Sequence, residues 1–384
     1  MGIRKLRGYL LDRGIVHLYS IFIAGYFLLP MASGHRRLYY LLVFPAVLLL
    51  ARELLAFYRG NQLSGLILLY VGYMMASLAW SSNFEAQAAI WAVGYSLALL
   101  SFIFISGYLW IQYPRQIERL LPRAVWLAAA AAVASIAVWY LNNPFPSSRL
   151  EPLGVMHHQN KGACAYGIFL VLCVYHTFAR KQQTHKGLGI AVALALLALI
   201  LFTQSRTALA GVSAALLVLL GYQALWVIVA GLGISFALVS VNPQDWWYRV
   251  ETFSFRPGIW KQLLTEMDGH WLFGRGYLVN PRIDAYGYTF DHAHNGYLAS
   301  LRDGGLVGLL LLLSVLAISV LWAIRLYRAS GQRLYLALLL YGMTVILMDF
   351  DRLLVHPKEL WLFFWLPIAL IMASYSRPPR GFAQ

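Results

Sequence analysis

Charged residues are scarce in this chain of 384 residues, at 12%, whereas hydrophobic residues make up 60%. This balance excludes an ordinary soluble domain, in which about a quarter of the residues are charged. The only two cysteines, Cys164 and Cys173, lie in one apolar run, which excludes a disulfide framework and a cysteine-based zinc site. The sequence also lacks a nucleotide-binding glycine motif, internal repeats and low-complexity tracts.

Long apolar runs fill most of the chain instead. A helix needs about 20 apolar residues to cross a bilayer, so we predict an all-α integral membrane protein with about twelve transmembrane helices. The first run follows a basic segment but is too long for a signal peptide, so we expect an uncleaved first helix. The predicted spans are 15–33, 38–57, 63–82, 88–112, 124–141, 162–179, 187–203, 208–222, 223–241, 306–324, 334–350 and 359–376.

Basic residues are divided unevenly between the two sides of the predicted membrane. With the N-terminus in the cytoplasm, the cytoplasmic segments hold sixteen lysines and arginines and the short outer loops hold seven. Basic loops face the cytoplasm, so we expect both termini to lie inside. The chain then divides into nine helices over 1–241, a large outer loop over 242–305, and three helices with a cytoplasmic tail over 306–384. The net charge of +15 is therefore mostly a topology signal rather than a sign of nucleic-acid binding. A second interpretation is attraction to anionic lipid or to a phosphorylated substrate.

The outer loop 242–305 differs in composition from the rest of the chain. It contains six lysines and arginines, three histidines and many aromatic residues. Long translocated loops are largely exempt from the charge rule, so the positive charge of this loop needs another reason than topology. We predict that the loop is catalytic and that the helices hold it in place.

Two arginines occupy positions where a positive charge is costly. Arg206 lies in a polar break between two apolar runs, where an arginine faces a cavity or snorkels to lipid headgroups. Arg256 comes just before Pro257, which suits the first turn of a helix. Its charge adds to the positive end of the helix dipole, which disfavours folding and favours anion binding. The simpler interpretation of Arg256 is a solvated loop residue.

The motif Asp291-His292-Ala293-His294-Asn295 offers a general base, since histidine commonly plays that part near neutral pH. A pair of surface histidines is the simpler interpretation. Two histidines could also bind zinc, but the sequence shows no third ligand at a recognised spacing. We therefore predict no metal at this motif.

Asp349 and Asp351, at the outer end of the eleventh predicted span, form a second motif. An acidic pair of this kind could hold a divalent metal together with a substrate phosphate. We favour acids at a helix end that pair with Arg352 or Lys358. A third interpretation is that one acid orients a histidine or an arginine.

Arginines, a histidine and aromatic rings beside a membrane together suit a lipid-linked diphosphate donor. Guanidinium groups bind phosphate oxygens in pairs and neutralise the charge that grows on a departing diphosphate. A histidine can take the proton of an attacking sugar hydroxyl. Tyrosine and tryptophan rings can stack on sugar rings.

Four short motifs have the order and spacing of a known family, most clearly over 190–325. They are Ser205-Arg206, Arg256-x-x-Ile259-Trp260, Phe273-Gly274-Arg275-Gly276-Tyr277, and His292-Ala293-His294-Asn295-x-x-Leu298 running into Gly304-Gly305-Leu306-Val307-Gly308. On these residues the chain resembles the O-antigen ligase and O-antigen polymerase superfamily of bacterial envelope enzymes. The N-terminal half matches mainly in hydropathy.

The resemblance implies a glycosyltransferase-C-like enzyme of the bacterial inner membrane, with its active site in a large periplasmic loop. It implies transfer of a glycan from undecaprenyl diphosphate to an acceptor, without nucleotide sugar, metal or other cofactor. Arg206 and Arg256 would bind the donor diphosphate, and His294 would activate the acceptor hydroxyl, with His292 as the alternative base. Further substrate contacts are expected at Trp260, Arg275, Tyr277, His292 and Asn295.

Ligases, polymerases and protein O-oligosaccharyltransferases share this core. The chain length, the twelve spans and the single large outer loop resemble a ligase best, which joins O-antigen to lipid A–core oligosaccharide. The phosphates and acidic sugars of that acceptor suit a cationic loop. The main alternative of another class is a transporter for a lipid-linked glycan, but the sequence shows no repeat symmetry of the kind that transporters use. A membrane anchor with a binding loop would not require Arg206.

Overall fold

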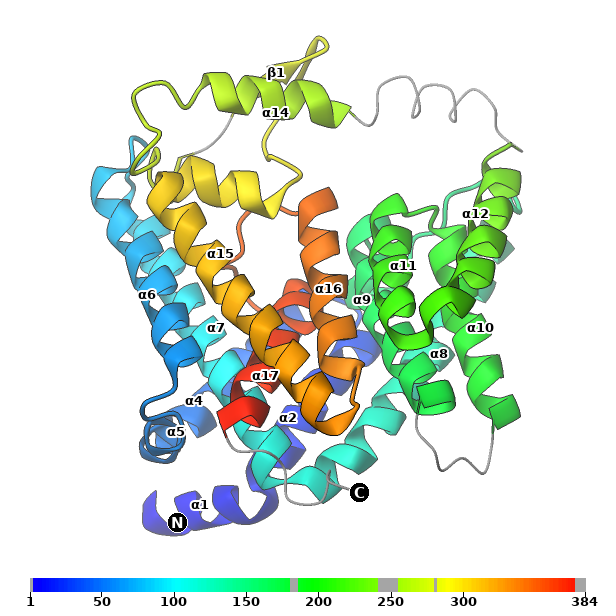
Figure 1. Cartoon of the computed structure of the whole chain (residues 1–384), viewed down its shortest axis with the longest axis horizontal. Helices are drawn as coiled ribbons and strands as arrows, with labels where there is room; N and C mark the ends of the chain where they lie inside the picture. Colours follow the sequence, from blue (N-terminus) through cyan, green and yellow to red (C-terminus); the bar gives the residue numbers. More distant parts are fainter. Residues whose placement is uncertain (1–2, 180–185, 241–254, 280–281, 377–384) are drawn as a thin grey trace.

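The computed structural model describes residues 3–179, 186–240, 255–279 and 282–376 of the chain. Helices make up most of these ranges, and their one sheet has two antiparallel strands. The helices form a bundle (Figure 1). One end carries α14 (Arg256–Thr265) and the hairpin of β1 (Ile283–Ala285) and β2 (Tyr288–Phe290), and the other end carries α1 (Ile3–Tyr9).

The remaining elements, in which η marks a 3-10 or π turn, follow one another closely along the chain. Up to residue 142 they are η1 (Leu10–Gly14), α2 (Ile15–Leu28), α3 (Ala32–Leu38), η2 (Tyr39–Val43), α4 (Phe44–Leu49), α5 (Ala51–Phe57), α6 (Gln62–Ala76), η3 (Ser77–Trp80), α7 (Ala86–Gln112) and α8 (Pro114–Asn142). Next come η4 (Gly154–Met156), α9 (Gln159–Val174), η5 (Tyr175–Ala179), α10 (Lys186–Phe202), α11 (Arg206–Leu220), η6 (Gly221–Gln223) and α12 (Ala224–Ser240). After the hairpin come α15 (Gly296–Ser330), α16 (Leu334–Met348), η8 (Trp361–Trp365) and α17 (Leu366–Ser376).

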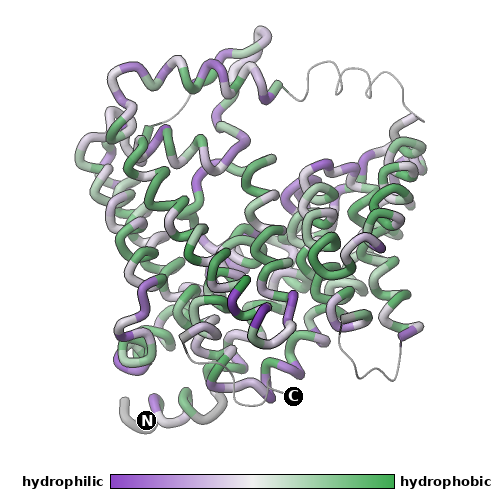
Figure 2. Tube along the Cα trace, in the orientation of Figure 1, coloured by the Kyte–Doolittle hydropathy of each residue, from purple (hydrophilic) through white to green (hydrophobic). Residues whose placement is uncertain are grey.

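Apolar residues make up most of each bundle helix, and polar residues are more frequent toward the two ends of the bundle (Figure 2). In the described ranges, six helices are long and apolar enough to cross a membrane. A seventh candidate is the pair Ala32–Leu49 and Ala51–Phe57, which is bent by 64°. Shorter apolar helices are Ile15–Leu28, Lys186–Phe202, Leu334–Met348 and Trp361–Tyr375. The prediction of an all-α membrane protein is confirmed, and the count of twelve spans stays a prediction.

The two predicted spans with almost no loop between them correspond to α11 and α12. The side chain of Ser205 caps α11 by accepting a hydrogen bond from the amide of Ala208. Gly221 ends the helix with a φ of 62°, which glycine adopts at no steric cost. Beyond it, α12 packs against both α10 and α11. By length and composition alone, Arg206–Leu238 counts as one apolar helix.

Helix α11 lies antiparallel against α16. At one end of the pair, the Arg333 guanidinium donates to the carbonyl oxygen of Leu219 at 3.2 Å. Nearer the other end, a Cβ added to Gly211 would lie 2.8 Å from Cγ2 of Val345, so a glycine is needed for this close approach. The first residues of α11 and the last residues of α16 therefore share one end of the bundle.

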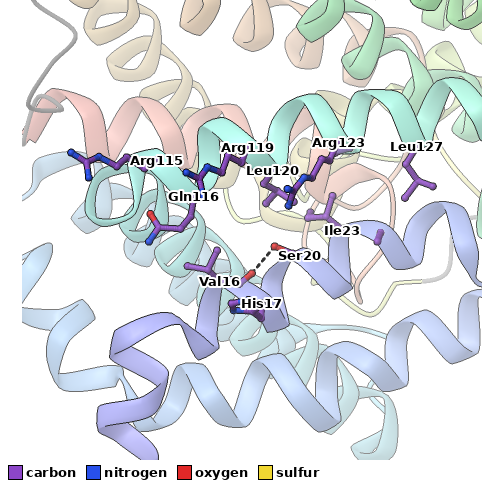
Figure 3. A pocket seen from close by; sticks show the side chains of 12 residues that line it. Val16, His17, Ser20, Ile23, Arg115, Gln116, Arg119, Leu120, Arg123 and Leu127 are labelled. Carbon is purple, nitrogen blue, oxygen red and sulfur yellow. Dashed lines mark hydrogen bonds between the residues drawn. The ribbon is translucent and has the colours of Figure 1, made fainter.

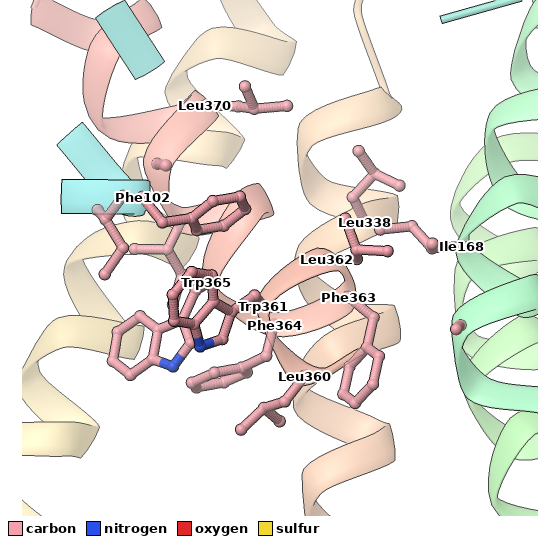
Figure 4. Packing of buried hydrophobic residues seen from close by; sticks show 14 of the residues in the cluster. Phe102, Ile168, Leu338, Leu360, Trp361, Leu362, Phe363, Phe364, Trp365 and Leu370 are labelled. Carbon is pink, nitrogen blue, oxygen red and sulfur yellow. The ribbon is translucent and has the colours of Figure 1, made fainter. Parts of the chain in front are cut away.

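The turn η8 consists of five buried residues, Trp361 to Trp365, that pack against α7, α9 and α16 (Figure 4). The indole N–H of Trp361 donates to the carbonyl of Val355 at 3.0 Å, and that of Trp365 donates to Leu353 at 2.9 Å. Both buried donors are satisfied, as buried polar groups require. These bonds fasten the loop 349–360 to the core.

Helix α15 bends at Gly305, which has φ 63° and ψ −164°. The sequence predicts a turn at Gly304 and Gly305 and a span from 306 onward, and the bend is at this position. The helix itself begins earlier, at Gly296, so its first turns belong to the predicted outer loop. Within that loop, residues 242–254 and 280–281 lie outside the described residues.

Candidate functional site

His294 is paired with a buried carboxylate that comes from a different helix. Its Nδ1 lies 2.8 Å from Oδ1 of Asp349, at the end of α16. The two side chains are 23% and 5% exposed. An Nδ1–H that donates to the carboxylate leaves Nε2 as a proton acceptor. Within the described residues Nε2 has no hydrogen-bond partner, which is the arrangement of an oriented general base.

Asp349 is held as an anion by several partners. Its oxygens also accept from the amide of Phe350 at 2.8 Å and from Nδ2 of Asn160 at 3.4 Å. Burial by itself would raise the pKa of Asp349. The hydrogen bond and charge of His294, the Phe350 amide and the charge of Arg256 outweigh burial and lower this pKa to about 2. The carboxylate is therefore ionised at neutral pH and can stabilise an imidazolium.

His292 has a different environment, although its ring centroid lies only 3.8 Å from that of His294. Its Nδ1 pairs with Asp291, whose carboxylate is 92% exposed. Because solvent surrounds this pair, it fixes the imidazole less firmly than a buried carboxylate does. The geometry thus gives the two histidines of the motif different surroundings.

Asp351 supports the histidine segment through its backbone. It accepts from the amide of Ala293 at 3.2 Å and from Nη1 and Nη2 of Arg302 at 2.9 and 3.2 Å. Arg302 is fully buried and donates a third bond to Asp303 at 2.7 Å, and Asp303 also accepts from Arg352 at 3.0 Å. The acidic pair therefore has other hydrogen-bond partners than the expected Arg352 and Lys358.

Arg256 stands at the first position of α14, directly after Phe255, which has a left-handed φ of 62°. Its Nε is buried and has no hydrogen-bond partner among the described residues. Burial lowers the pKa of Arg256, and the charge of Asp349 opposes that change, so the two groups lie within electrostatic range. A buried N–H without a partner is costly, and a phosphate oxygen would satisfy it.

Arg206 begins α11 and is exposed, at the end of the bundle where α16 ends. A chain of hydrogen bonds connects the polar break before it to Asp349. Nε of Arg149 donates to the carbonyl of Thr203 at 2.7 Å, and its Nη2 donates to Oδ1 of Asn160 at 2.5 Å. Asn160 in turn donates to Asp349. The break and the carboxylate thus belong to one polar network.

Two other predicted site residues hold the histidine segment in place. The indole of Trp260 donates to the carbonyl of Ala293 at 3.0 Å, which joins α14 to that segment. Asn295 caps α15 by accepting from the amides of Tyr297 and Leu298 at 3.0 and 3.1 Å. Contacts of Trp260 and Asn295 with substrate stay predictions.

Arg275 and Tyr277 also have protein partners. Arg275 forms an ion pair of 2.6 Å with Glu266. The Tyr277 hydroxyl donates to the carbonyl of Leu354, and the guanidinium of Arg352 lies over its buried ring, 5.1 Å from the centroid. Both residues thus help to hold the outer segment in place through contacts with other protein groups. Their contact with substrate stays a prediction.

Backbone strain is concentrated at the predicted site. Left-handed φ values are uncommon for residues with a side chain, and each costs about 1–3 kcal/mol unless its surroundings enforce it. Such residues in the described ranges are Gln204, Phe255, Tyr286, His294 and Phe350. All but Tyr286 coincide with His294 or lie one or two residues from Arg206, Arg256 or Asp349. This pattern is typical of a functional site.

The fold also supplies a third metal-ligand candidate that the sequence motif lacks. One ligand atom from each of His292, His294 and Asp349 lies within 4.8 Å of the others. Two imidazoles and a carboxylate can bind zinc or a similar divalent cation. The Oδ1 of Asp349 that faces His294 also accepts from a backbone amide, and this pattern equally suits a carboxylate that orients a base.

The sequence alone does not indicate a role for Arg149 or Asn160, and it suggests Lys358 only as a pairing partner of Asp349 or Asp351. Lys358 is largely buried, which lowers its pKa; Glu359 opposes this and the charge of Lys161 adds to it. The structure thus places further positive charge near Asp349, in addition to that of the two predicted arginines. The available signal was the polar stretch before the sixth predicted span, which contains Asn160 and Lys161.

No protein-family model matches the chain. A curated O-antigen ligase from Pseudomonas aeruginosa is 30% identical to it over 362 residues, which cover 92% of this chain and 88% of that protein. The similarity therefore extends far beyond the motifs of 190–325 and includes the N-terminal half. Identity at this level over nearly the whole length shows common descent, and the chain belongs to the O-antigen ligase family.

Proposed function

We propose that the chain transfers O-antigen polysaccharide from undecaprenyl diphosphate to lipid A–core oligosaccharide, at the periplasmic face of the bacterial inner membrane. The observation that carries this proposal is the pairing of His294 with the buried Asp349, with Arg256 in electrostatic range and its Nε without a hydrogen-bond partner among the described residues. A base and an anion-binding guanidinium are the two groups that such a transfer needs. The similarity to an O-antigen ligase supports the choice of donor and acceptor.

In the proposed reaction, the acceptor hydroxyl attacks the anomeric carbon of the lipid-linked glycan. Nε2 of His294 takes the hydroxyl proton as the new glycosidic bond forms. The bond from the anomeric carbon to the diphosphate breaks, its electron pair leaves with the diphosphate, and the configuration inverts. Asp349 stabilises the imidazolium that results.

Arg256 and Arg206 bind the diphosphate in this proposal. The Nε of Arg256, which has no partner within the part of the chain that the structure describes, provides an N–H for a phosphate oxygen. Its attraction to the phosphate is stronger because the guanidinium is partly desolvated. Negative charge grows on the diphosphate as it departs, so these contacts strengthen in the transition state. Lys161, Lys358 and Arg149 add positive potential around the same carboxylate.

We propose that the transfer is independent of metal. The oxygens of Asp349 are engaged by His294, the Phe350 amide and Asn160, so the carboxylate already has partners without a cation. The competing arrangement, in which His292, His294 and Asp349 hold a divalent cation, uses the same atoms. The two predict opposite responses to a chelator.

The test is a transfer assay with purified protein, undecaprenyl-diphosphate-linked glycan and lipid A–core, with and without EDTA. We expect a glycan block on lipid A–core and no effect of EDTA. A glycan that lengthens on its lipid carrier would mean a polymerase, and transfer to a protein would mean an oligosaccharyltransferase. Loss of transfer with EDTA would refute the metal-independent mechanism. The absence of product with every acceptor would favour transport.

A further inference from the structure

A cavity of about 600 Å³ lies between the N-terminal parts of α2 and α8 (Figure 3). It is at the opposite end of the bundle from His294. The carbonyl of Leu29, just after α2, accepts from the amide of Val155 at 3.2 Å, close to the start of α9 and therefore to Asn160. The first turns of α2 are at the other end of that helix, so the cavity is separate from the candidate active site.

Three arginines of α8 line one side of this cavity. Arg115, Arg119 and Arg123 are spaced by four residues, so they lie on one face of the helix, and all three are exposed. Among the described residues, none of the three forms a hydrogen bond or an ion pair. Like charges at this spacing repel one another. Gln116, His17 and Ser20 complete the polar part of the lining.

Beyond Ser20 on α2 and beyond Arg123 on α8 the lining is apolar, and two further apolar residues, Val16 and Leu120, lie among the polar ones. From Arg119 to the last lining residue of α8, Leu127, the helix rises about 12 Å. On α2, Ile23 lies beyond the polar His17 and Ser20 in the same direction (Figure 3). The apolar lining residues are Val16, Ile23, Ala24, Leu120, Ala124 and Leu127. The cavity therefore changes from cationic to apolar toward the middle of the bundle.

This polarity matches a phosphate group that carries an acyl chain. Guanidinium forks bind phosphate oxygens in pairs, and a bound anion would relieve the repulsion among the three charges. A volume of this size holds drug-sized ligands, of roughly 300–1,000 Å³, and is far larger than one phosphate needs. Basic pockets between transmembrane helices commonly hold anionic lipid headgroups. The apolar wall gives the adjoining chain a place to pack.

We propose that this cavity binds an anionic membrane phospholipid, with its headgroup phosphate on Arg115, Arg119 and Arg123 and the start of an acyl chain on the apolar wall. The site belongs to the leaflet opposite to the candidate active site. The ligand is bound and not transformed there.

The test measures lipid retention by the purified full chain with native mass spectrometry, using phosphatidylglycerol and phosphatidylcholine as probes. Wild type is expected to retain phosphatidylglycerol in preference to phosphatidylcholine. The variant R115Q/R119Q/R123Q is expected to bind it about a hundredfold more weakly, if each arginine contributes as a basic residue at an anionic surface typically does. The matched control R52Q/R59Q/R328Q removes three exposed arginines elsewhere and should retain wild-type binding. Equal losses in the two variants would overturn the proposal.

Two further arms complete the experiment. The single variant R119Q, with its fold checked by size-exclusion chromatography, is expected to lose about fivefold in affinity, and wild-type affinity in this variant would also overturn the proposal. Soluble glycerol phosphate at a concentration equal to the lipid should not displace it. Displacement at equal concentration would show that the acyl chain contributes nothing and would assign the cavity to a soluble phosphate.

Discussion

The backbone of His294 is held in a left-handed conformation, with a φ of 48°. A strained residue persists only when its surroundings determine its position. Here the preceding residue, Ala293, is bonded to Trp260 on its carbonyl and to Asp351 on its amide, and the following residue, Asn295, caps α15. The imidazole therefore projects in a direction that its neighbours impose, toward the carboxylate of Asp349.

His294→Ala should abolish transfer, because the buried pair loses its proton acceptor. A general base typically contributes about 10²–10⁴ in rate. His292→Ala is the matched control, since this histidine pairs with an exposed acid, and it should keep most of the activity. Both are measured as transfer to lipid A–core, with donor binding assayed separately. Activity lost in His292→Ala and kept in His294→Ala would reverse the assignment.

Asp349→Asn should lower kcat on the order of 10²–10⁴-fold, because the amide can hold the wrong imidazole tautomer and cannot stabilise an imidazolium. The KM for the donor should change little, since the carboxylate does not bind the diphosphate in the proposed reaction. Steady-state kinetics with varied donor separate the two effects. Asp284→Asn, at an exposed acid of the hairpin, should behave as wild type. A selective rise in the KM would assign Asp349 to the binding of donor instead.

Arg256→Lys keeps the charge and removes the planar fork, so donor binding should weaken about tenfold or more. This variant also loses the Nε, which has no partner among the residues that the structure describes. Arg282→Lys makes the same change at an exposed arginine of the outer segment and should have no effect. The measurement is the affinity for undecaprenyl-diphosphate-linked glycan. Wild-type affinity in Arg256→Lys would refute binding through the fork.

At the scale of elements, the candidate site is assembled from helix ends. The N-termini of α9, α11, α14 and α15 supply Asn160, Arg206, Arg256 and the cap at Asn295, and the C-terminus of α16 supplies Asp349. Helix N-termini present unpaired amides and the positive end of the dipole. Several such ends at one side of the bundle give a positive potential that suits a diphosphate.

The bend of α15 is a second feature of the elements that positions the candidate site. The segment from Trp271 to Gly276 lies against it, with the Leu306 amide donating to Trp271 at 2.7 Å and the Gly276 amide donating to Asp303 at 3.0 Å. A Cβ added to Gly305 would lie 2.4 Å from the carbonyl oxygen of Leu272. The glycines of both motifs thus allow two backbones to meet, and this contact positions the start of α15 and the histidine before it.

Gly305→Ala should destabilise the protein by about 2 kcal/mol or more, because a side chain there meets both a left-handed φ and a backbone carbonyl. Gly287→Ala is the matched control: its φ of 77° is also left-handed, but a Cβ there has no neighbour within 4 Å. It should cost only about 1 kcal/mol. Thermal unfolding in detergent measures both. Equal losses of stability would show that the contact with Leu272 does not matter.

At the scale of the whole molecule, the two described ends of the chain lie at the same end of the bundle. The Arg7 guanidinium pairs with Glu53 of α5 near that end. Close to the other terminus, the Met372 carbonyl of α17 accepts from Nδ2 of Asn61, shortly after α5, at 3.1 Å. This arrangement agrees with an even number of crossings, as predicted from the basic loops.

Cysteine labelling can test the predicted orientation. Cys164 and Cys173 are both buried, so they should react little with a membrane-impermeant maleimide. Glu151→Cys, in a loop near the candidate site, should react in intact spheroplasts. Arg59→Cys, an exposed position at the other end, should react only after the membrane is permeabilised. The reverse pattern would place the candidate site in the cytoplasm.

The sequence by itself determined the class of protein and most of the candidate residues. Apolar runs of spanning length leave a chain no other way to satisfy its backbone in lipid than by forming helices. The costly positions of Arg206 and Arg256 were visible because charge stands out against so apolar a background. The bend at Gly305 could also be predicted, since glycine pairs mark turns locally.

Only the tertiary structure decided which aspartate pairs with which histidine. Asp349 is far along the chain from His294, and Asn160 and Arg149 are farther still, so no local pattern joins them. Their contacts depend on the antiparallel packing of α11 on α16 and on the docking of α14, which place helix ends together. The cavity beside α8 has the same origin: the spacing of its three arginines is local, but its apolar wall needs α2 beside it. Contacts between distant segments arise from packing, and packing is a property of the folded whole.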